Sequence, residues 1–414
     1  MVTALAGEMA GCLHYAVTVE SPCRIVLVAG ARPNFIKIAP IARALASEPR
    51  VFSTTLVHTG QHYDAGMSDV FFDELGIPRP DFNLHVGSGS HARQTAAVMT
   101  GFEDVLLKTK PDMVLVVGDV NSTVACALTA AKLQIPVAHV EAGLRSFDRS
   151  MPEEINRVLT DQISDWLFTT EPAAQANLVR EGVDPARIHF VGNVMIDSLL
   201  FCREHARRLG IPATLGLTSI PYAVLTLHRP HNVDDRDTFE QIMHGIDHIS
   251  HDVVIVFPMH PRTRETLSAS HAAAAMLEAG RLRLVEPQGY LEFLGLVERS
   301  EVVLTDSGGV QEETTVLGVP CLTLRPNTER PATVSEGTNK IVGTSTERII
   351  EAWEGIKASA PPAGRRPQLW DGRAAERIVE VLRSGVESGA IARRADRGVE
   401  TMTPRHRLAM KRTG

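Results

Sequence analysis

Aromatic residues form only 5% of this 414-residue chain, too few for a surface on which nucleic-acid bases stack. An excess of positive charge is also lacking, because 49 Asp and Glu outnumber 42 Lys and Arg and give a formal net charge of −7 at pH 7. No general attraction to nucleic acid or to an anionic membrane is therefore expected. Long apolar runs are lacking as well, and none reaches the ~18 residues needed to cross a bilayer. We expect neither nucleic acid nor a membrane as a partner.

Cysteine is sparse and scattered. The five cysteines lie at positions 12, 23, 126, 202 and 321. Their odd number and the lack of Cys-x-x-Cys spacing fit a reducing compartment and argue against structural zinc. The first 20 residues contain Glu8 and Glu20 but no Lys or Arg, so they lack the basic start of a signal peptide. These features predict a cytoplasmic protein with a disordered leader over residues 1–22.

The length is too great for one ordinary core and suits two domains of about 100–200 residues each. Apolar residues form 44% and charged residues 22% of the chain, as in ordinary soluble globular proteins. We expect a first domain over 23–195 and a second over 196–365. A further helix is expected over about 369–388, and the basic tail, 389–414, is predicted to be disordered.

Short apolar strands alternate with helical stretches in both halves. Strands are expected at 24–29, 51–57, 112–117, 136–140, 166–170, 222–227, 252–257, 281–285, 301–305 and 321–324. Helices are expected at 35–46, 67–75, 91–108 and 122–133. This alternation predicts a parallel sheet with right-handed crossovers in each half. The fold class is therefore α/β, with two Rossmann-like domains whose sheets face a central cleft.

The stretch VLTDSGGVQEE, residues 303–313, joins a strand to a helix through Ser307, Gly308 and Gly309. At the carboxyl edge of a parallel sheet, such a turn lets an anion approach backbone N–H groups at the helix start. Glu313, further along the helix, is placed to accept hydrogen bonds from sugar hydroxyls. The alternative is that the turn is only a tight connection.

A second strand–glycine–helix unit carries Arg32 and Lys37 beside the turn at 30–34. Two cations at a helix start oppose the helix dipole. This unfavourable placement brings no evident gain in stability, which suggests a functional role for Arg32 and Lys37. The alternative is that they only increase surface solubility.

Carboxylates follow two of the expected strands, Asp119 after 112–117 and Glu141 after 136–140. They belong in the ligand crevice of an open α/β sheet. Asp119 alternatively caps the next helix. Glu153 opens a further helix, where it alternatively closes a capping box with Ser150 as the N-cap. His58 and His62 lack a third ligand of suitable spacing, so hydrogen bonding is favoured over a metal site.

Several motifs occur in a fixed order: GARPNFIKIAP, GDVNST, HVEAGLRSF, MPEEINR, TLHR and TDSGGVQEE…LRPNTERP. In this order they resemble the non-hydrolysing UDP-N-acetylglucosamine 2-epimerase family over about residues 24–385. The resemblance implies a GT-B fold in which the C-terminal helix packs back on the first domain. It also implies a UDP-sugar substrate with UDP as the nucleotide, a homodimer, and no metal or other cofactor. The resemblance also implies epimerisation at C2 of the sugar through elimination and re-addition of UDP. The product is expected to be a precursor of cell-surface polysaccharide.

The resemblance assigns roles to individual residues. Asp119, Glu141 and Glu153 match the catalytic carboxylates, and His228 matches the histidine beside the diphosphate. Substrate-binding positions are matched by Arg32, Lys37, Gln288, Phe293, Ser307, Gly308, Gly309, Glu313 and Arg330. Gln61, His62, Arg93 and Gln94 fit a second, allosteric UDP-GlcNAc site.

The chain also departs from the family pattern. His231 stands in HRPHN where the family often has a carboxylate. The segments HTGQHYDAGM and MHPRT resemble the branch that acts on UDP-2,3-diacetamido-2,3-dideoxy-glucuronic acid, whereas LRPNTERP favours UDP-GlcNAc. A GT-B glycosyltransferase, a hydrolysing epimerase and a non-catalytic nucleotide-sugar sensor are the rival functions.

Overall fold

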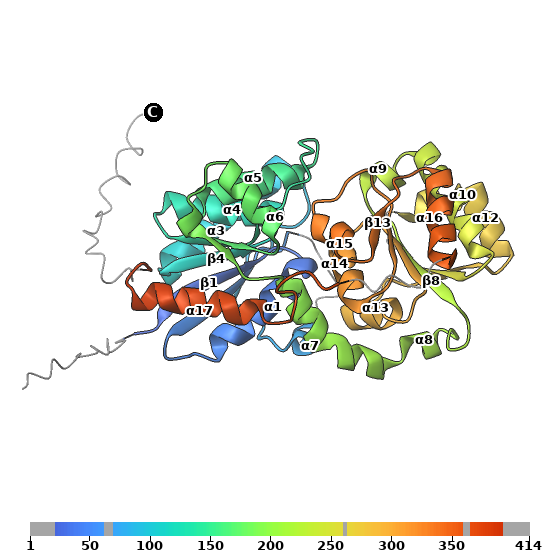
Figure 1. The fold of residues 1–414 in the computed structure, drawn as a ribbon. Coiled ribbons are helices and arrows are strands. Elements are labelled where there is room, and N and C mark those ends of the chain that lie inside the picture. The colour runs from blue at the N-terminus through green and yellow to red at the C-terminus, as the bar shows by residue number, and fades with distance from the viewer. Residues whose placement is uncertain (1–20, 62–68, 260–262, 359–364, 392–414) are drawn as a thin grey trace, which may run out of the picture.

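The structure is a computed structural model that describes residues 21–61, 69–259, 263–358 and 365–391. His62, nearly all of the predicted leader and most of the predicted tail therefore lie outside the described residues. Two α/β halves lie side by side, each built on one parallel sheet (Figure 1). Within the described ranges, no helix is long and apolar enough to cross a membrane.

The first sheet has seven strands in the order β3-β2-β1-β4-β5-β6-β7. The bounds are β1 Cys23–Ala29, β2 Phe52–His58, β3 Phe82–Asn83, β4 Met113–Val117, β5 Val137–Ala142, β6 Trp166–Thr169 and β7 Ile188–Phe190. Successive side chains of a strand point to opposite faces. In β1, Ile25 and Leu27 therefore join one apolar cluster, and Val26 and Val28 join another. Both faces are buried, which explains the near-continuous apolar strands in the sequence.

The second sheet has six strands in the order β10-β9-β8-β11-β12-β13. The bounds are β8 Tyr222–Thr226, β9 Val254–Pro258, β10 Leu282–Val285, β11 Val302–Thr305, β12 Cys321–Thr323 and β13 Asn339–Ile341. All recorded pairings in both sheets are parallel. The predicted α/β class with two parallel sheets is therefore confirmed.

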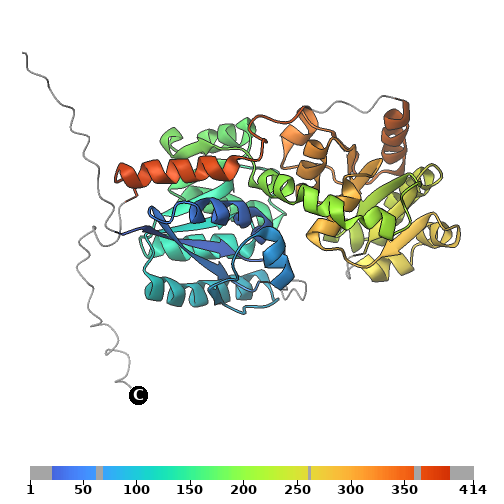
Figure 2. The same ribbon diagram turned by 90° about the horizontal axis from the view of Figure 1, so that it is seen from below.

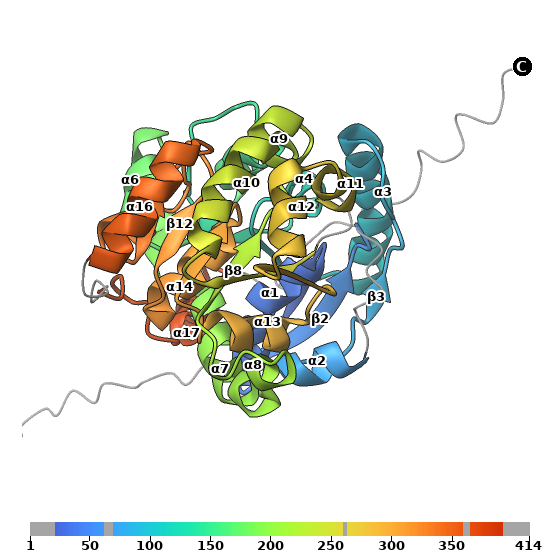
Figure 3. The ribbon, with the colours of Figure 1, turned by 90° about the vertical axis from the view of Figure 1, so that its right-hand side faces the viewer.

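The helices cover both faces of each sheet. In the first half they are α1 Arg32–Ala46, α2 Asp69–Leu75, α3 His91–Thr109, α4 Asn121–Lys132, α5 Pro152–Ile163, α6 Pro172–Arg180 and α7 Val194–Leu209, with a 3₁₀ turn at Pro185–Arg187. The remaining helices are α8 Ile211–Thr214, α9 Pro230–Val233, α10 Arg236–Ser250, α11 Arg264–Ser268, α12 His271–Glu278, α13 Tyr290–Val297, α14 Gly308–Leu317, α15 Pro331–Ser335, α16 Thr346–Ala358 and α17 Ala374–Glu387. Seen end-on, α10, α12 and α16 lie apart from α13 and α14, which cover the other face of the second sheet (Figure 3).

Helices α7 and α17 join the two halves. The predicted boundary at 195/196 falls in the first turn of α7, which contacts both α1 and α13. Helix α17 returns to lie along α1 (Figures 1 and 2). Its start is fixed by Asp197, whose carboxylate accepts the N–H groups of Ala374 at 3.1 Å and Ala375 at 2.7 Å. The C-terminal segment is thereby tied to the first half by polar as well as apolar contacts.

Local details differ from the sequence-based expectations. The helix expected from residue 35 already begins at Arg32. Ser150 is not the expected N-cap, because α5 is capped by Met151 without a side-chain bond, and the Ser150 hydroxyl donates to Asp148 at 2.6 Å instead. The short strands β3, β7 and β13 were not predicted, because two or three residues carry no recognisable periodicity.

Candidate active site

The candidate site lies where the carboxyl ends of both sheets meet. Strands β4 and β5 end beside Asp119 and Glu141, and strands β8 and β11 end beside His228 and Ser307. Parallel pairing places these ends at one edge of each sheet. Arg330 of the second half crosses to the first half and donates a hydrogen bond from Nη2 to Oε1 of Glu141 at 2.6 Å.

Glu141 is held in an unusual backbone conformation. Its φ is +72°, a region that costs a non-glycine residue free energy and is concentrated at functional sites. The pairing of β5 with β6 shifts between Val140 and Ala142, so the bulge re-aims this side chain. The buried carboxylate contacts Lys37 of α1 and Arg330. Cations from both halves therefore hold the same carboxylate.

The two cations of the first turn have separate positions. Lys37 is buried and paired with Glu141. Arg32 is only partly buried, and its guanidinium lies 5.2 Å from the centre of the Phe71 ring. Its predicted ligand contact stays a prediction.

Asp119 is not the helix cap that its position also allowed. The N-cap of α4 is Val120, and Asp119 instead pairs with Arg157 of α5. Burial opposes its ionisation, but Arg157 and Lys37 outweigh burial and lower the pKa of Asp119. Asn156 fixes the backbone there, donating from Nδ2 to the Asp119 carbonyl at 2.9 Å. Asp119 is therefore favoured in its ionised form, and Lys37 acts on it as well as on Glu141.

The two adjacent glutamates of α5 have different surroundings. Glu154 is buried, accepts the N–H groups of Ser146 at 3.0 Å and Phe147 at 2.9 Å, and pairs with Arg157. Glu153 is half-buried, and within the described residues no hydrogen bond or ion pair is recorded for it. Its carboxylate is therefore available, and the capping-box alternative is wrong.

His228 is oriented by a carboxylate. Its Nδ1 lies 2.9 Å from Oδ1 of the fully buried Asp306. Asp306 also accepts the backbone N–H groups of His228 at 3.0 Å and Arg229 at 2.9 Å. Burial opposes its charge, yet the bonds with His228 lower the pKa of Asp306. An ionised Asp306 requires a hydrogen on Nδ1, so Asp306 sets the orientation and the tautomer of this partly exposed ring.

Arg330 is shared by three buried carboxylates. Besides Glu141, it pairs through Nε with Glu312 at 2.8 Å and through Nη1 with Glu329 at 2.7 Å. Burial raises the pKa of Glu312 to about 7, although Arg330 opposes the shift. For Glu329 the order is reversed: Arg330 and Arg325 outweigh burial and hold its pKa well below its usual range.

The glycine-rich turn opens α14, which begins at Gly308 rather than after Gly309. A Cβ on Gly308 would lie 2.5 Å from Nη1 of Arg330, so only glycine allows this close approach. The first N–H groups of a helix lack partners within the helix and favour an anion. Glu313 is buried in the same helix, and burial raises its pKa to about 7.

Gln288 and Phe293, two of the predicted substrate-binding residues, lie near the start of α13. Gln288 is half-buried and donates from Nε2 to the Glu286 carbonyl at 2.7 Å. Phe293 is half-buried and packs on the apolar cluster that contains Val310 of α14. Their contacts with a ligand stay predictions.

Most side chains described for the predicted allosteric site are engaged in hydrogen bonds within the protein. Gln61 is buried, and its Oε1 accepts from the Ser122 N–H at 2.9 Å. Gln94 donates from Nε2 to the Gln61 carbonyl at 2.8 Å, and Arg93 is exposed. With His62 outside the described residues, an allosteric role stays a prediction.

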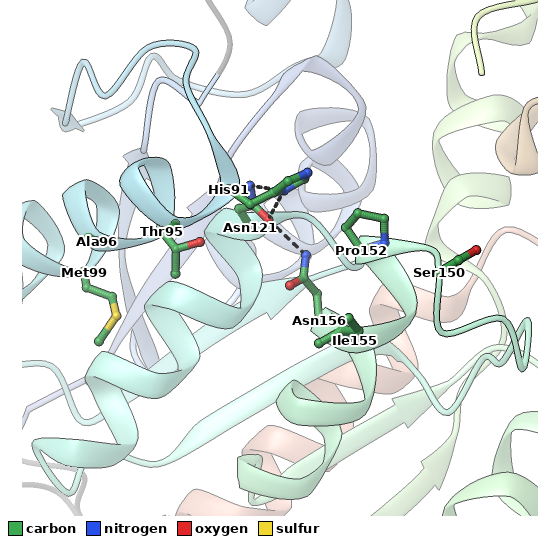
Figure 4. Close-up of a pocket in the computed structure, with 10 residues that line it drawn as sticks. His91, Thr95, Ala96, Met99, Asn121, Ser150, Pro152, Ile155 and Asn156 are labelled. Carbon is green, nitrogen blue, oxygen red and sulfur yellow. Dashed lines mark hydrogen bonds between the residues drawn. The ribbon is translucent and has the colours of Figure 1, made fainter. Parts of the chain in front are cut away.

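A cavity of about 570 Å³ lies between α3, α4 and α5 (Figure 4). Its walls are mainly apolar, and polar contacts are made by His91, Asn121 and Asn156. Asn156 connects this wall to the site, because it also bonds Asn121 at 3.2 Å and the Asp119 carbonyl. None of the residues predicted to bind substrate lines this cavity.

Sequence reasoning missed Arg157, Asp306, Glu312 and Glu329. Arg157 lies three residues after Glu154 in a helix, a spacing that favours an ion pair and that could have revealed it. Asp306 directly precedes the glycine-rich turn but has partners 77 and 78 residues away. Within the described part of the chain, no group of three or more His, Cys, Asp or Glu side chains is arranged to hold a metal ion.

Two Rossmann-like halves that meet across a carboxylate-rich edge define an enzyme of the GT-B architecture. A family model described as UDP-N-acetylglucosamine 2-epimerase matches residues 43–383. The chain belongs to this family of isomerases.

Relatives of this chain are similar over nearly their whole length. The UDP-N-acetylglucosamine 2-epimerase of Methanocaldococcus jannaschii is 45% identical over 87% of this chain and 99% of its own length. The UDP-2,3-diacetamido-2,3-dideoxy-D-glucuronate 2-epimerase of Pseudomonas aeruginosa is 45% identical over 80% of this chain and 91% of its own.

Solved structures agree with the fold. The M. jannaschii enzyme in complex with UDP-GlcNAc and UDP has a TM-score of 0.81 at 45% identity, covering 87% of this chain and all of that one. The Neisseria meningitidis UDP-GlcNAc 2-epimerase bound to UDP-GlcNAc has a TM-score of 0.79 at 31% identity, covering 87% and 99%.

Proposed function

We propose that the protein is a non-hydrolysing 2-epimerase that interconverts UDP-N-acetylglucosamine and UDP-N-acetylmannosamine. The observation that carries the proposal is the contact between Glu141 and Arg330, which joins a carboxylate edge to an anion-binding edge. Arg330 lies against Gly308 at the start of α14. The carboxylates of the first half thus lie beside the place where a diphosphate would bind.

The reaction we propose is an anti elimination followed by re-addition. A carboxylate removes the C2 proton, the C2–H electron pair forms the C1=C2 double bond, and the C1–O bond breaks with its electrons on UDP. Re-addition of UDP to C1 of the 2-acetamidoglucal accompanies protonation of C2 on the opposite face. Asp119, Glu141 and Glu153 supply the acid and the base that act on the two faces of C2.

Charge develops on the leaving diphosphate. His228 and the N–H groups at Ser307–Gly309 would stabilise it where it forms, with Arg330 close by. Lys37 and Arg32 would bind the substrate from the first half, Glu313 the ribose, and Gln288 and Phe293 the uridine. The product would serve as a ManNAc-type precursor of cell-surface polysaccharide in the cytoplasm.

The deciding experiment is NMR of UDP-GlcNAc with the protein in D₂O, without an acceptor. We expect deuterium at C2 and the appearance of UDP-ManNAc. Transfer to an added acceptor without exchange would favour a GT-B glycosyltransferase, and release of free ManNAc with UDP would favour a hydrolysing epimerase. Tight binding without turnover would indicate a nucleotide-sugar sensor.

The second candidate substrate is UDP-2,3-diacetamido-2,3-dideoxy-glucuronic acid. It is supported by the 45% identity to the P. aeruginosa relative, equal to that with the M. jannaschii enzyme. This sugar differs by a C6 carboxylate and a C3 acetamido group, so kcat/KM on the two substrates separates the candidates. A higher value on the diacetamido sugar would replace our first choice.

We also propose that the protein is a homodimer that associates through α3 and α5. Ile155 and Leu159 of α5 are exposed at 44% and 51%, and Ile155 lines the apolar cavity between these helices. A charge at either position would be buried by association. Light scattering of the protein and of Leu159→Glu tests this, with a dimer and a monomer expected, respectively.

A further inference from the structure

A buried histidine lies directly behind the catalytic carboxylates. His139, in β5, is fully buried. Its Nδ1 lies 2.7 Å from Oδ1 of Asp161, and its Nε2 lies 2.9 Å from the Gly118 carbonyl oxygen. Neither the sequence motifs nor the proposed reaction gives this side chain a role.

Each ring nitrogen of His139 lies at hydrogen-bond distance from an oxygen atom. A carbonyl oxygen only accepts, so Nε2 carries a hydrogen. The other oxygen of Asp161 accepts the Gly143 N–H at 3.1 Å and pairs with Arg145 at 2.7 Å, as expected of an ionised carboxylate. Nδ1 therefore faces an acceptor as well, so both ring nitrogens of His139 point at hydrogen-bond acceptors.

This pair contacts all three segments that carry the predicted catalytic carboxylates. The Gly118 carbonyl belongs to the peptide bond that leads into Asp119. Gly143 lies two residues after Glu141, which has the positive φ. Asp161 lies in α5, whose first turn carries Glu153. One pair thus links the turns after β4 and β5 to α5.

We propose that His139 and Asp161 form an ionised positioning pair that holds the three carboxylate-bearing segments in register for the reaction. The proposal rests on the proposed epimerase activity. The pair acts through Asp119 and Glu141 and does not itself touch the substrate. A misplacement of about 1 Å at a reacting group costs about 10²-fold in rate, so a shared anchor for these turns is valuable.

The charges around the pair nearly cancel. Arg145 from the turn after β5 faces Asp161, and Glu181 after α6 pairs with Arg145 at 2.6 Å. Asp119 follows the bonded Gly118 directly. Removing the charge of His139 would therefore leave Asp119 with less positive charge nearby, which favours its protonated form.

The experiment uses His139→Gln, Asp161→Asn and the double variant, with His248→Gln as the control. His248 pairs with Glu354 on the surface between α10 and α16. We expect each single variant to lower kcat for C2 exchange about 10²-fold, while UDP affinity, measured by calorimetry, stays unchanged. The double variant should lose no more than the singles, because both remove the same pair.

Two further readouts separate positioning from a structural role. In His139→Gln, the pH below which kcat is lost should move upward, whereas a merely structural role would leave it in place. In the unaltered protein, ¹⁵N NMR should show both imidazole nitrogens of His139 protonated. This spectrum is informative even if His139→Gln does not fold or the protein shows no epimerase activity.

Specific outcomes would overturn the proposal. These are a neutral His139 ring, a normal kcat in folded His139→Gln, or equal losses of kcat and UDP affinity. Absence of C2 exchange in the unaltered protein would instead refute the proposed function, and the imidazole spectrum would still decide the ion pair.

Discussion

Glu141 and Arg330 lie 189 positions apart in the chain, and their side chains meet at 2.6 Å across the two halves. Both are buried. The contact links the sheet edge that carries Asp119 to the edge that carries Gly308. The candidate active site is therefore assembled from both halves.

Replacing Arg330 by Met should destabilise the protein. Three buried carboxylates, Glu141, Glu312 and Glu329, would lose their shared cation. Removing one partner of a buried ion pair costs about 3–5 kcal/mol, and we expect a loss of this size in urea unfolding. The exposed Arg299→Met is the control and should change little. A loss in Arg330→Met no larger than in the control would contradict the shared-cation role.

Asp119→Asn and Glu141→Gln should each lower turnover by about 10²–10⁴-fold, the range for losing a general acid or base. UDP affinity should remain, because the diphosphate turn belongs to the second half. Initial rates of C2 exchange and calorimetry with UDP measure the two effects. Full activity in either variant would remove that carboxylate from the mechanism.

Asp306→Asn should disturb the tautomer of His228 without unfolding the chain. The amide oxygen can still accept the backbone N–H groups of His228 and Arg229, but the amide nitrogen would face Nδ1 and favour the wrong tautomer. We expect kcat to fall about 10²-fold, the lower limit for losing one donor that stabilises developing charge. Steady-state kinetics checks this, with the partly exposed Asp252→Asn as the control.

Gly308→Ala and Gly309→Ala form a matched pair. A Cβ at Gly308 would lie 2.5 Å from Nη1 of Arg330, which three carboxylates hold in place, whereas at Gly309 the nearest atom is Cε of Met195 at 3.4 Å. We expect Gly308→Ala to lose about 1–3 kcal/mol through overpacking. Gly309→Ala should be near neutral or slightly stabilised. Urea unfolding measures both, and equal values would contradict the clash.

Stability should decrease as the pH rises towards neutrality. Burial raises the pKa values of Glu171, Glu312 and Glu313 to about 7 from an ordinary 4.5. Between these values the folded protein keeps protons that the unfolded chain has released, so the free energy of unfolding falls with pH and levels off above about 7. Unfolding across this range should be less pH-dependent in Glu171→Gln. If the free energy of unfolding of this variant changed with pH as steeply as in the unaltered protein, the raised pKa of Glu171 would be contradicted.

The elements were predictable where their signals are local. An apolar β-branched run such as VLVV specifies a strand by itself, and the glycines after β11 specify a turn through their own backbone freedom. Local signals did not show which of the adjacent residues Glu153 and Glu154 is buried. Both stand at the start of α5, yet only Glu154 reaches Arg157 and the turn at Ser146, so burial depends on how α5 packs on its neighbours.

The sequence alone determined two α/β halves and the turns that follow the longer strands, because side-chain periodicity and turn chemistry act over a few residues. The family was indicated separately, by the resemblance of several motifs in a fixed order. Only the tertiary structure decided that Asp306 orients His228, that Arg330 pairs with three carboxylates, and that His139 lies between Asp161 and the Gly118 carbonyl. Those facts depend on groups distant in the chain meeting in a dry interior, where each charge must find its partner.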